Sequence, residues 1–147
     1  MSPRSKSSLL LLLLPAALAW GANTQIASDQ PIVNFRLPEF TPEGNRAWLV
    51  RGSEARYVSR EQIDITGLNL SIFNEQPDGK VETLILAPVA QVRPVDQLVR
   101  GSDTIRVIND RLEATGADWV FSHKEKKISI NKNVHVILNT ELSSLLQ

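Results

Sequence analysis

The chain has 147 residues, with 16 Lys and Arg balanced by 16 Asp and Glu, and 42% of its residues are hydrophobic. This length fits one domain, the apolar fraction excludes a disordered chain, and the neutral balance argues against a nucleic-acid binder, which needs clustered cations. Because there is no Cys, the composition excludes a disulfide scaffold, a thiolate zinc site, a cysteine nucleophile and an acylated lipoprotein.

The first 19 residues have the order of a secretory signal peptide. Arg4 and Lys6 precede an apolar run, Leu9–Ala19, which ends in small residues. The alternative is a retained inner-membrane anchor, but a spanning helix needs about 20 apolar residues and Pro15 interrupts this run. We therefore predict a cleaved signal peptide over 1–19 and a periplasmic protein.

Residues 20–31 are polar and small and predict a linker, after which apolar residues recur at every second position, as in half-buried β-strands. The alternating runs are Trp48–Val50, Ile63–Ile65, Leu68–Ile72, Val81–Ile85, Ile105–Val107, Trp119–Phe121, Ile128–Ile130 and Val134–Leu138. Turn-forming residues separate the runs at Pro42–Asn45, Gln76–Gly79, Asn109–Asp110 and Asn131–Asn133. We predict an all-β sandwich, jelly roll or barrel over 32–139, then a short tail over 140–147 in which Thr140–Leu146 has helical spacing.

Two glycines mark local features of these strands. Around Gly67 the apolar positions switch from odd to even numbers, which indicates a β-bulge. Asp78 and Gly79, between Phe73 and Val81, predict a hairpin turn.

Part of the strand region repeats at an offset of 49 residues. Val50–Glu54 recurs as Val99–Asp103, and Ile63–Gly67 matches Leu112–Gly116. We interpret this as a duplicated unit of a few strands. The alternative is that both matches reflect general strand and turn chemistry, since Gly and Asp recur at any turn.

The sequence contains no recognisable catalytic or metal-binding motif. It has no nucleophile elbow, zinc-protease motif, phosphate-binding loop or dinucleotide fingerprint. We interpret His123 and His135 as solvent-facing strand residues and Lys124–Lys127 as a solvated hairpin turn, with contact to a lipid phosphate as the alternative for the turn. The prediction is a protein that is not an enzyme and has no cofactor and no metal.

The large aromatic side chains admit two interpretations. They lie in or beside predicted strands, at Trp48, Tyr57, Phe73, Trp119 and Phe121. They form either a closed core or the lining of a groove for an apolar ligand, because the same alternation serves both.

Several short motifs recur in a defined order over residues 32–138. They are Phe35–Phe40, Trp48-x-x-x-Gly52, Ala55-x-Tyr57, Ala87–Ala90, Val99-x-Gly101, Leu112-x-Ala114-x-Gly116-x-Asp118-Trp119, Ile128-x-Ile130 and Asn133-Val134-x-Val136. In order and spacing they resemble the strands of LptC-type periplasmic proteins of lipopolysaccharide export, and the last resembles the closing strand shared with the LptA/OstA group.

This resemblance implies an open, twisted antiparallel β-jellyroll that carries the lipid A acyl chains of lipopolysaccharide in an apolar groove. The family receives lipid from an inner-membrane ABC transporter and passes it towards the outer membrane through LptA-like proteins, by edge-strand pairing. LptC proteins commonly keep a transmembrane helix, whereas the N-terminal segment here is short and Ala17-Leu18-Ala19 predicts a cleavage site. An LptA-like soluble bridge therefore stays open as an alternative to an LptC-like receiver.

Strand alternation predicts which side chains would bind lipid in such a groove. The predicted lipid-binding residues are Trp48, Val50, Leu70, Ile72, Ile105, Val107, Trp119, Phe121, Val134 and Val136. The alternative function is a secreted structural module with a closed core, which binds proteins through its edge strands and carries no lipid.

Overall fold

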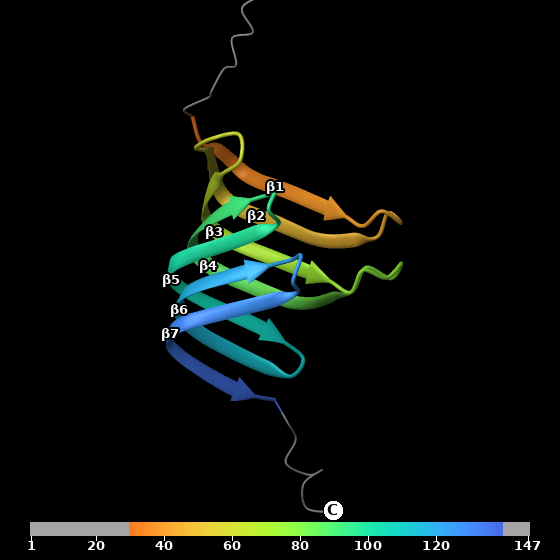
Figure 1. Ribbon diagram of the computed structural model, residues 1–147, viewed down its shortest axis with the longest axis vertical. Coiled ribbons are helices and arrows are strands. Elements are labelled where there is room, and N and C mark those ends of the chain that lie inside the picture. The colour runs from red at the N-terminus through yellow and green to blue at the C-terminus, as the bar shows by residue number, and fades with distance from the viewer. Residues whose placement is uncertain (1–29, 140–147) are drawn as a thin grey trace, which may run out of the picture.

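The computed structural model describes residues 30–139, which form one antiparallel sheet of seven strands (Figure 1). The strands are β1 (Ile32–Phe40), β2 (Arg46–Tyr57), β3 (Ile63–Phe73), β4 (Val81–Arg93), β5 (Leu98–Asn109), β6 (Leu112–Ser122) and β7 (Lys127–Leu138). Each strand pairs with the next in sequence, so β1 and β7 are the edges and the sheet does not close. The predicted all-β, open antiparallel architecture is confirmed. The predicted signal peptide, nearly all of the linker and the tail lie outside the described residues.

Inward-facing side chains form continuous apolar rows across the sheet. The first row, in register from β1 to β7, is Leu37, Val50, Leu70, Ile85, Val107, Ala114 and Val136. The second row, from β2 to β7, is Tyr57, Ile63, Val92, Val99, Phe121 and Ile128. All but the end members of these rows are buried, so alternation across hydrogen-bonded strands builds the core.

The two halves of the sheet face each other across this core. Trp48 of β2 lies against Phe121 of β6, with ring centroids 6.2 Å apart, although β2 and β6 are not neighbours in the sheet. The strands must therefore bend near their middles, as β5 to β7 do in Figure 1. The bend places the first and second rows on opposite walls of a single core.

Irregular residues lie where the strands bend. Gly67 has a φ of 64°, and the buried positions of β3 change there from Ile65 to Leu68, so the predicted change of facing is confirmed. The predicted bulge is wrong, because the pairing register with β4 is the same on both sides of Gly67. A left-handed glycine turns the strand without adding a residue, and glycine adopts that conformation without steric cost.

The predicted turn at Asn131–Asn133 is also wrong, because β7 continues through these residues. Between Thr115 and Ala117 the pairing of β6 with β7 shifts, and β7 there carries one extra residue, which is a β-bulge. Asn133 has a φ of 52°. Asn is among the few residues that tolerate this region, and for that reason it also favours turns, so its presence does not distinguish a bulge from a turn.

The other predicted turns connect strands as expected. Gly79 donates its backbone N–H to the carbonyl oxygen of Gln76, 3.0 Å away, which forms the predicted hairpin between β3 and β4. The two matched segments form the hairpins β2–β3 and β5–β6, and β6 begins and ends 49 residues after β3. Their registers differ, since Val50 pairs with Leu70 whereas Val99 pairs with Phe121, so the duplication stays a prediction.

Gly101 is required by the close approach of Trp119. A Cβ at this position would come within 2.7 Å of the indole Nε1, and Trp119 is only 1% exposed, so its ring has no room to move aside. We expect Gly101→Ala to lower the free energy of unfolding by about 1–3 kcal/mol, the usual cost of overpacking. Urea denaturation measures this, with the exposed neighbour Ser102→Ala as the control. Equal midpoints for the two variants would contradict the assignment.

Candidate lipid-binding face

Most of the predicted lipid-binding residues are buried in the hydrophobic core. Seven of them are buried: Trp48, Val50, Leu70, Ile105, Val107, Trp119 and Phe121. Ile72 is partly buried against the same core. Val134 and Val136, both on β7, are 48% and 51% exposed. Only these two members of the predicted set therefore offer a large accessible apolar surface.

The C-terminal half of β7 extends the core to the open edge of the sheet. Val136 lies opposite Ala114, and Leu138 lies opposite Leu112, both of which contact the core. The side chains of Val136 and Leu138 therefore continue the inner face, and no strand within residues 30–139 covers them. Ile137, between them, points to the outer face beside Glu113.

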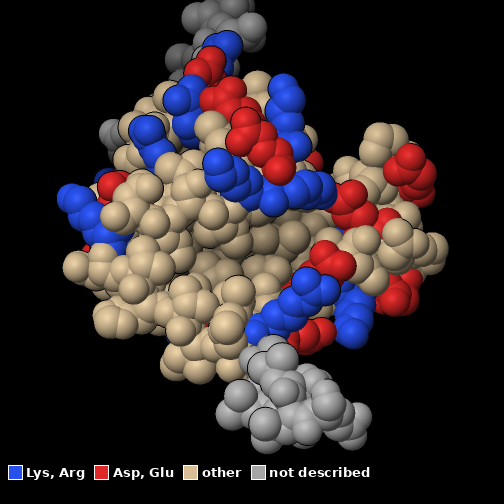
Figure 2. All heavy atoms as spheres, turned by 60° about the horizontal axis from the view of Figure 1, so that its bottom comes forward, with Lys and Arg blue, Asp and Glu red and all other residues tan. Residues whose placement is uncertain are grey.

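Figure 2 views the molecule with this end turned forward. The centre of the view is hollowed, and the walls of the hollow carry no Lys, Arg, Asp or Glu side chain. Charged side chains gather at its upper and right-hand borders. An uncharged hollow with a charged border can take an apolar chain that has a polar head.

Two clefts lie along the bend, where the pairing of β4 with β5 is interrupted between Leu86 and Gln91. One cleft, of about 730 Å³, includes Ile105 in its lining, and the other, of about 620 Å³, includes Trp119. These two buried candidates thus border clefts at the bend, whereas Val134 and Val136 lie on the edge strand β7.

His123 is buried, contrary to the prediction that it faces solvent. It is 8% exposed, and its ring stacks on Trp48 with a centroid distance of 5.7 Å and an interplanar angle of 5°. The predicted hairpin turn at Lys124–Lys127 is confirmed, and these residues are exposed. His135 is exposed, as predicted.

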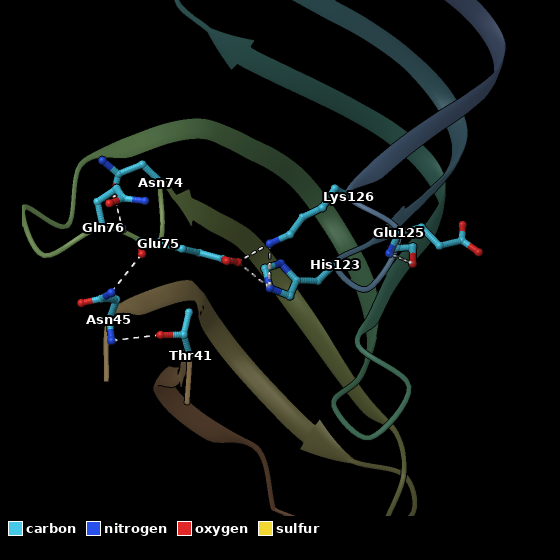
Figure 3. Close-up of polar contacts among 9 residues, drawn as sticks. Thr41, Asn45, Asn74, Glu75, Gln76, His123, Glu125 and Lys126 are labelled. Carbon is cyan, nitrogen blue, oxygen red and sulfur yellow. Dashed lines mark hydrogen bonds and ion pairs between the residues drawn. The ribbon is translucent and has the colours of Figure 1, made fainter. Parts of the chain in front are cut away.

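Two charged side chains meet the edge of the His123 ring (Figure 3). Oε1 of Glu75, from the β3–β4 turn, lies 3.2 Å from Nε2 of His123 and accepts a hydrogen bond from Nζ of Lys126. The Lys126 hydrogen bond is the largest cause that lowers the pKa of Glu75 below 4.5. Burial, followed by the positive charge of Lys126, lowers the pKa of His123 below 6.5.

A family model described as lipopolysaccharide-assembly, LptC-related, matches residues 18–139. The chain belongs to the LptC family. The resemblance in the order of the short motifs is thereby confirmed, and the open all-β sheet agrees with the jellyroll of that family. No curated protein matches the chain.

LptC proteins act in lipopolysaccharide transport. Membership of the family therefore implies two general partners for this chain, lipopolysaccharide and the Lpt transporter. The family is a transport component and is not known as an enzyme. Its members are periplasmic or associated with the inner membrane. Over residues 30–139, no helix is long and apolar enough to cross a membrane, and no group of three or more His, Cys, Asp or Glu could hold a metal ion.

Sequence reasoning missed the cluster of Glu75, His123 and Lys126 in this LptC-family chain. Lys126 and His123 share one turn, but Glu75 lies on a different hairpin, and no local pattern links the two turns. Only the bend of the sheet, which is a tertiary feature, brings them together.

Proposed function

We propose that this chain is a non-enzymatic periplasmic carrier of lipopolysaccharide. It holds lipid A acyl chains on the inner face of the sheet, receives them from an inner-membrane ABC transporter and passes them to an LptA-like protein. The observation that supports this most is the extension of the inner apolar face, through Val136 and Leu138, onto an edge that no other strand of residues 30–139 covers. An acyl chain on that face would continue the packing of the core.

The energetics suit a carrier that must release its cargo. Burying one CH₂ group contributes about 0.8 kcal/mol, so half-burying a long acyl chain contributes roughly 5 kcal/mol. A binding free energy of this size holds lipid reversibly, because it falls well short of the free energy of tight binding. Direction must come from ATP hydrolysis in the transporter, since this sequence contains no nucleotide-binding motif.

Both edge strands support hand-over by strand pairing. Within residues 30–139, β1 and β7 each pair with one neighbour only, which leaves backbone N–H and C=O groups on their outer sides. Addition of a partner strand to β7 would also continue the inner apolar face from one protein into the next. We assign the LptA-like partner to this edge.

Site-specific photocrosslinking tests the carrier function. A photoreactive residue at Val136 is expected to crosslink to lipopolysaccharide in producing cells. The same residue at His135, which pairs with Thr115 on the outer face, is the matched control and is expected to give no lipid crosslink. Equal lipid crosslinking at the two positions, or none at Val136 in a folded and exported protein, would contradict the proposal.

A further inference from the structure

Three hairpin turns meet at the end of the bent sheet where Trp48 and Phe121 close the core. The β3–β4 turn supplies Glu75, and the β6–β7 turn supplies His123 and Lys126. The backbone N–H of His123 also donates to the carbonyl oxygen of Gln97, in the β4–β5 turn, at 3.0 Å. Contacts between turns that are not consecutive in the chain therefore hold this end together.

The rings beneath these contacts form the end of the core. His123 stacks on Trp48, and Phe121 meets the His123 ring edge-on at a centroid distance of 6.2 Å. Trp48 and Phe121 are among the most deeply buried residues of the protein. Moving the β6–β7 turn away would uncover both of them.

We propose that Glu75, His123 and Lys126 form a clasp that keeps this end of the sheet shut and that opens when His123 takes up a proton. The lipid-carrying face would then have a closed end at the clasp and an open side at β7. The clasp itself does not depend on the interior carrying lipid.

The geometry explains why conversion of the neutral His123 ring to the imidazolium ion destabilises the closed form. Nδ1 of His123 is buried and has no hydrogen-bond partner within the described residues, so protonation would either leave an unpaired N–H or require the ring to move. Nζ of Lys126 lies 3.3 Å from Nε2 and repels an imidazolium ion. An exposed ring in an open turn has neither cost.

Negative groups around the His123 ring favour its protonation, but they do not outweigh burial and the positive charge of Lys126. Glu75 from the β3–β4 turn and Glu39 from β1 both favour the imidazolium ion, whereas Lys126 disfavours it. A cavity of about 290 Å³ is lined by His123 and Glu75 and also by Lys124, which adds a second positive charge there. Burial has the largest effect, and the pKa of His123 in the closed form lies below 6.5.

The sign of the pH dependence follows from linkage. When the pKa of a base is lower in the closed form, the open form binds more protons, so the closed form loses stability as the pH falls below 6.5 towards the lowered pKa of His123. Glu75 has a pKa below 4.5, so its carboxylate stays ionised over this range. Opening near pH 6 would therefore result from protonation of His123 rather than of Glu75.

Distance measurements between the two turns test the clasp. The chain has no native Cys, so spin labels attach only at Gln76→Cys and Glu125→Cys, one on each turn. Glu125 points away from His123 in Figure 3, and Gln76 is exposed. We expect a single short distance at about pH 8 and a reversible gain of a longer distance at about pH 5, with circular dichroism unchanged.

Two further variants separate protonation from other effects of acid. His123→Phe keeps a flat ring against Trp48 but cannot bind a proton, so its distance should be the same at both pH values. Glu75→Gln loses the charged contact with Lys126 and should show the longer distance already at about pH 8. A wild-type distance that does not change with pH, or an equal change in His123→Phe, would overturn the proposal. No lipid is present, so this result is independent of lipopolysaccharide binding.

Discussion

Trp119→Ala is expected to lower the free energy of unfolding by about 3–5 kcal/mol, which is the usual cost of removing a large buried aromatic side chain. Trp119 is 1% exposed and faces the core from β6, opposite Gly101 of β5. The loss combines the transfer free energy of the indole with the cavity that it leaves. Urea denaturation followed by circular dichroism measures the change.

A neighbouring residue supplies the control for this substitution. Val120 lies on the same strand but faces outward and is 36% exposed, so Val120→Ala is expected to cost less than about 1 kcal/mol. The cost of Gly101→Ala should also disappear in the Trp119→Ala background, because the clashing ring is absent. Additive costs in the double variant would show that Gly101 and Trp119 do not interact.

The strands of this protein could be predicted because alternation is a local signal. Burial on one face forces apolar residues to every second position, so runs such as Trp48–Val50 and Ile105–Val107 report their strands directly. The turn at Asp78 and Gly79 was also predicted correctly, because this residue pair between two strands indicates a hairpin turn. Asn131–Asn133 was not, because residues that tolerate a positive φ serve bulges as well as turns.

The environment of single residues could not be read from the sequence. His123 follows Phe121 in the same strand alternation, but the four residues after it are charged, which favoured an exposed turn. Its burial results from stacking on Trp48, 75 residues earlier in the chain, once the sheet bends. The same limit applies to the lipid-binding set, since alternation gives the inner face but not where that face is left uncovered.

The uncovered part of the inner face leads to the second large expected effect. Val136→Asp is expected to weaken lipopolysaccharide binding about tenfold or more, because an acyl chain on β7 would have to desolvate the new carboxylate. Val136 is 51% exposed, so the variant should fold with little loss of stability. Displacement of a fluorescent lipopolysaccharide from the purified protein measures the affinity.

Ile137→Asp is the matched control for this prediction, because it changes the adjacent residue of the same strand on the other face. Ile137 is 65% exposed and pairs with Glu113, so a carboxylate there meets the outer surface and should leave lipid affinity within about twofold of the wild type. A charge-driven loss of strand pairing at the β7 edge would affect both variants equally. A difference between the two therefore assigns the effect to the inner face, whereas equal affinities would place the lipid away from β7.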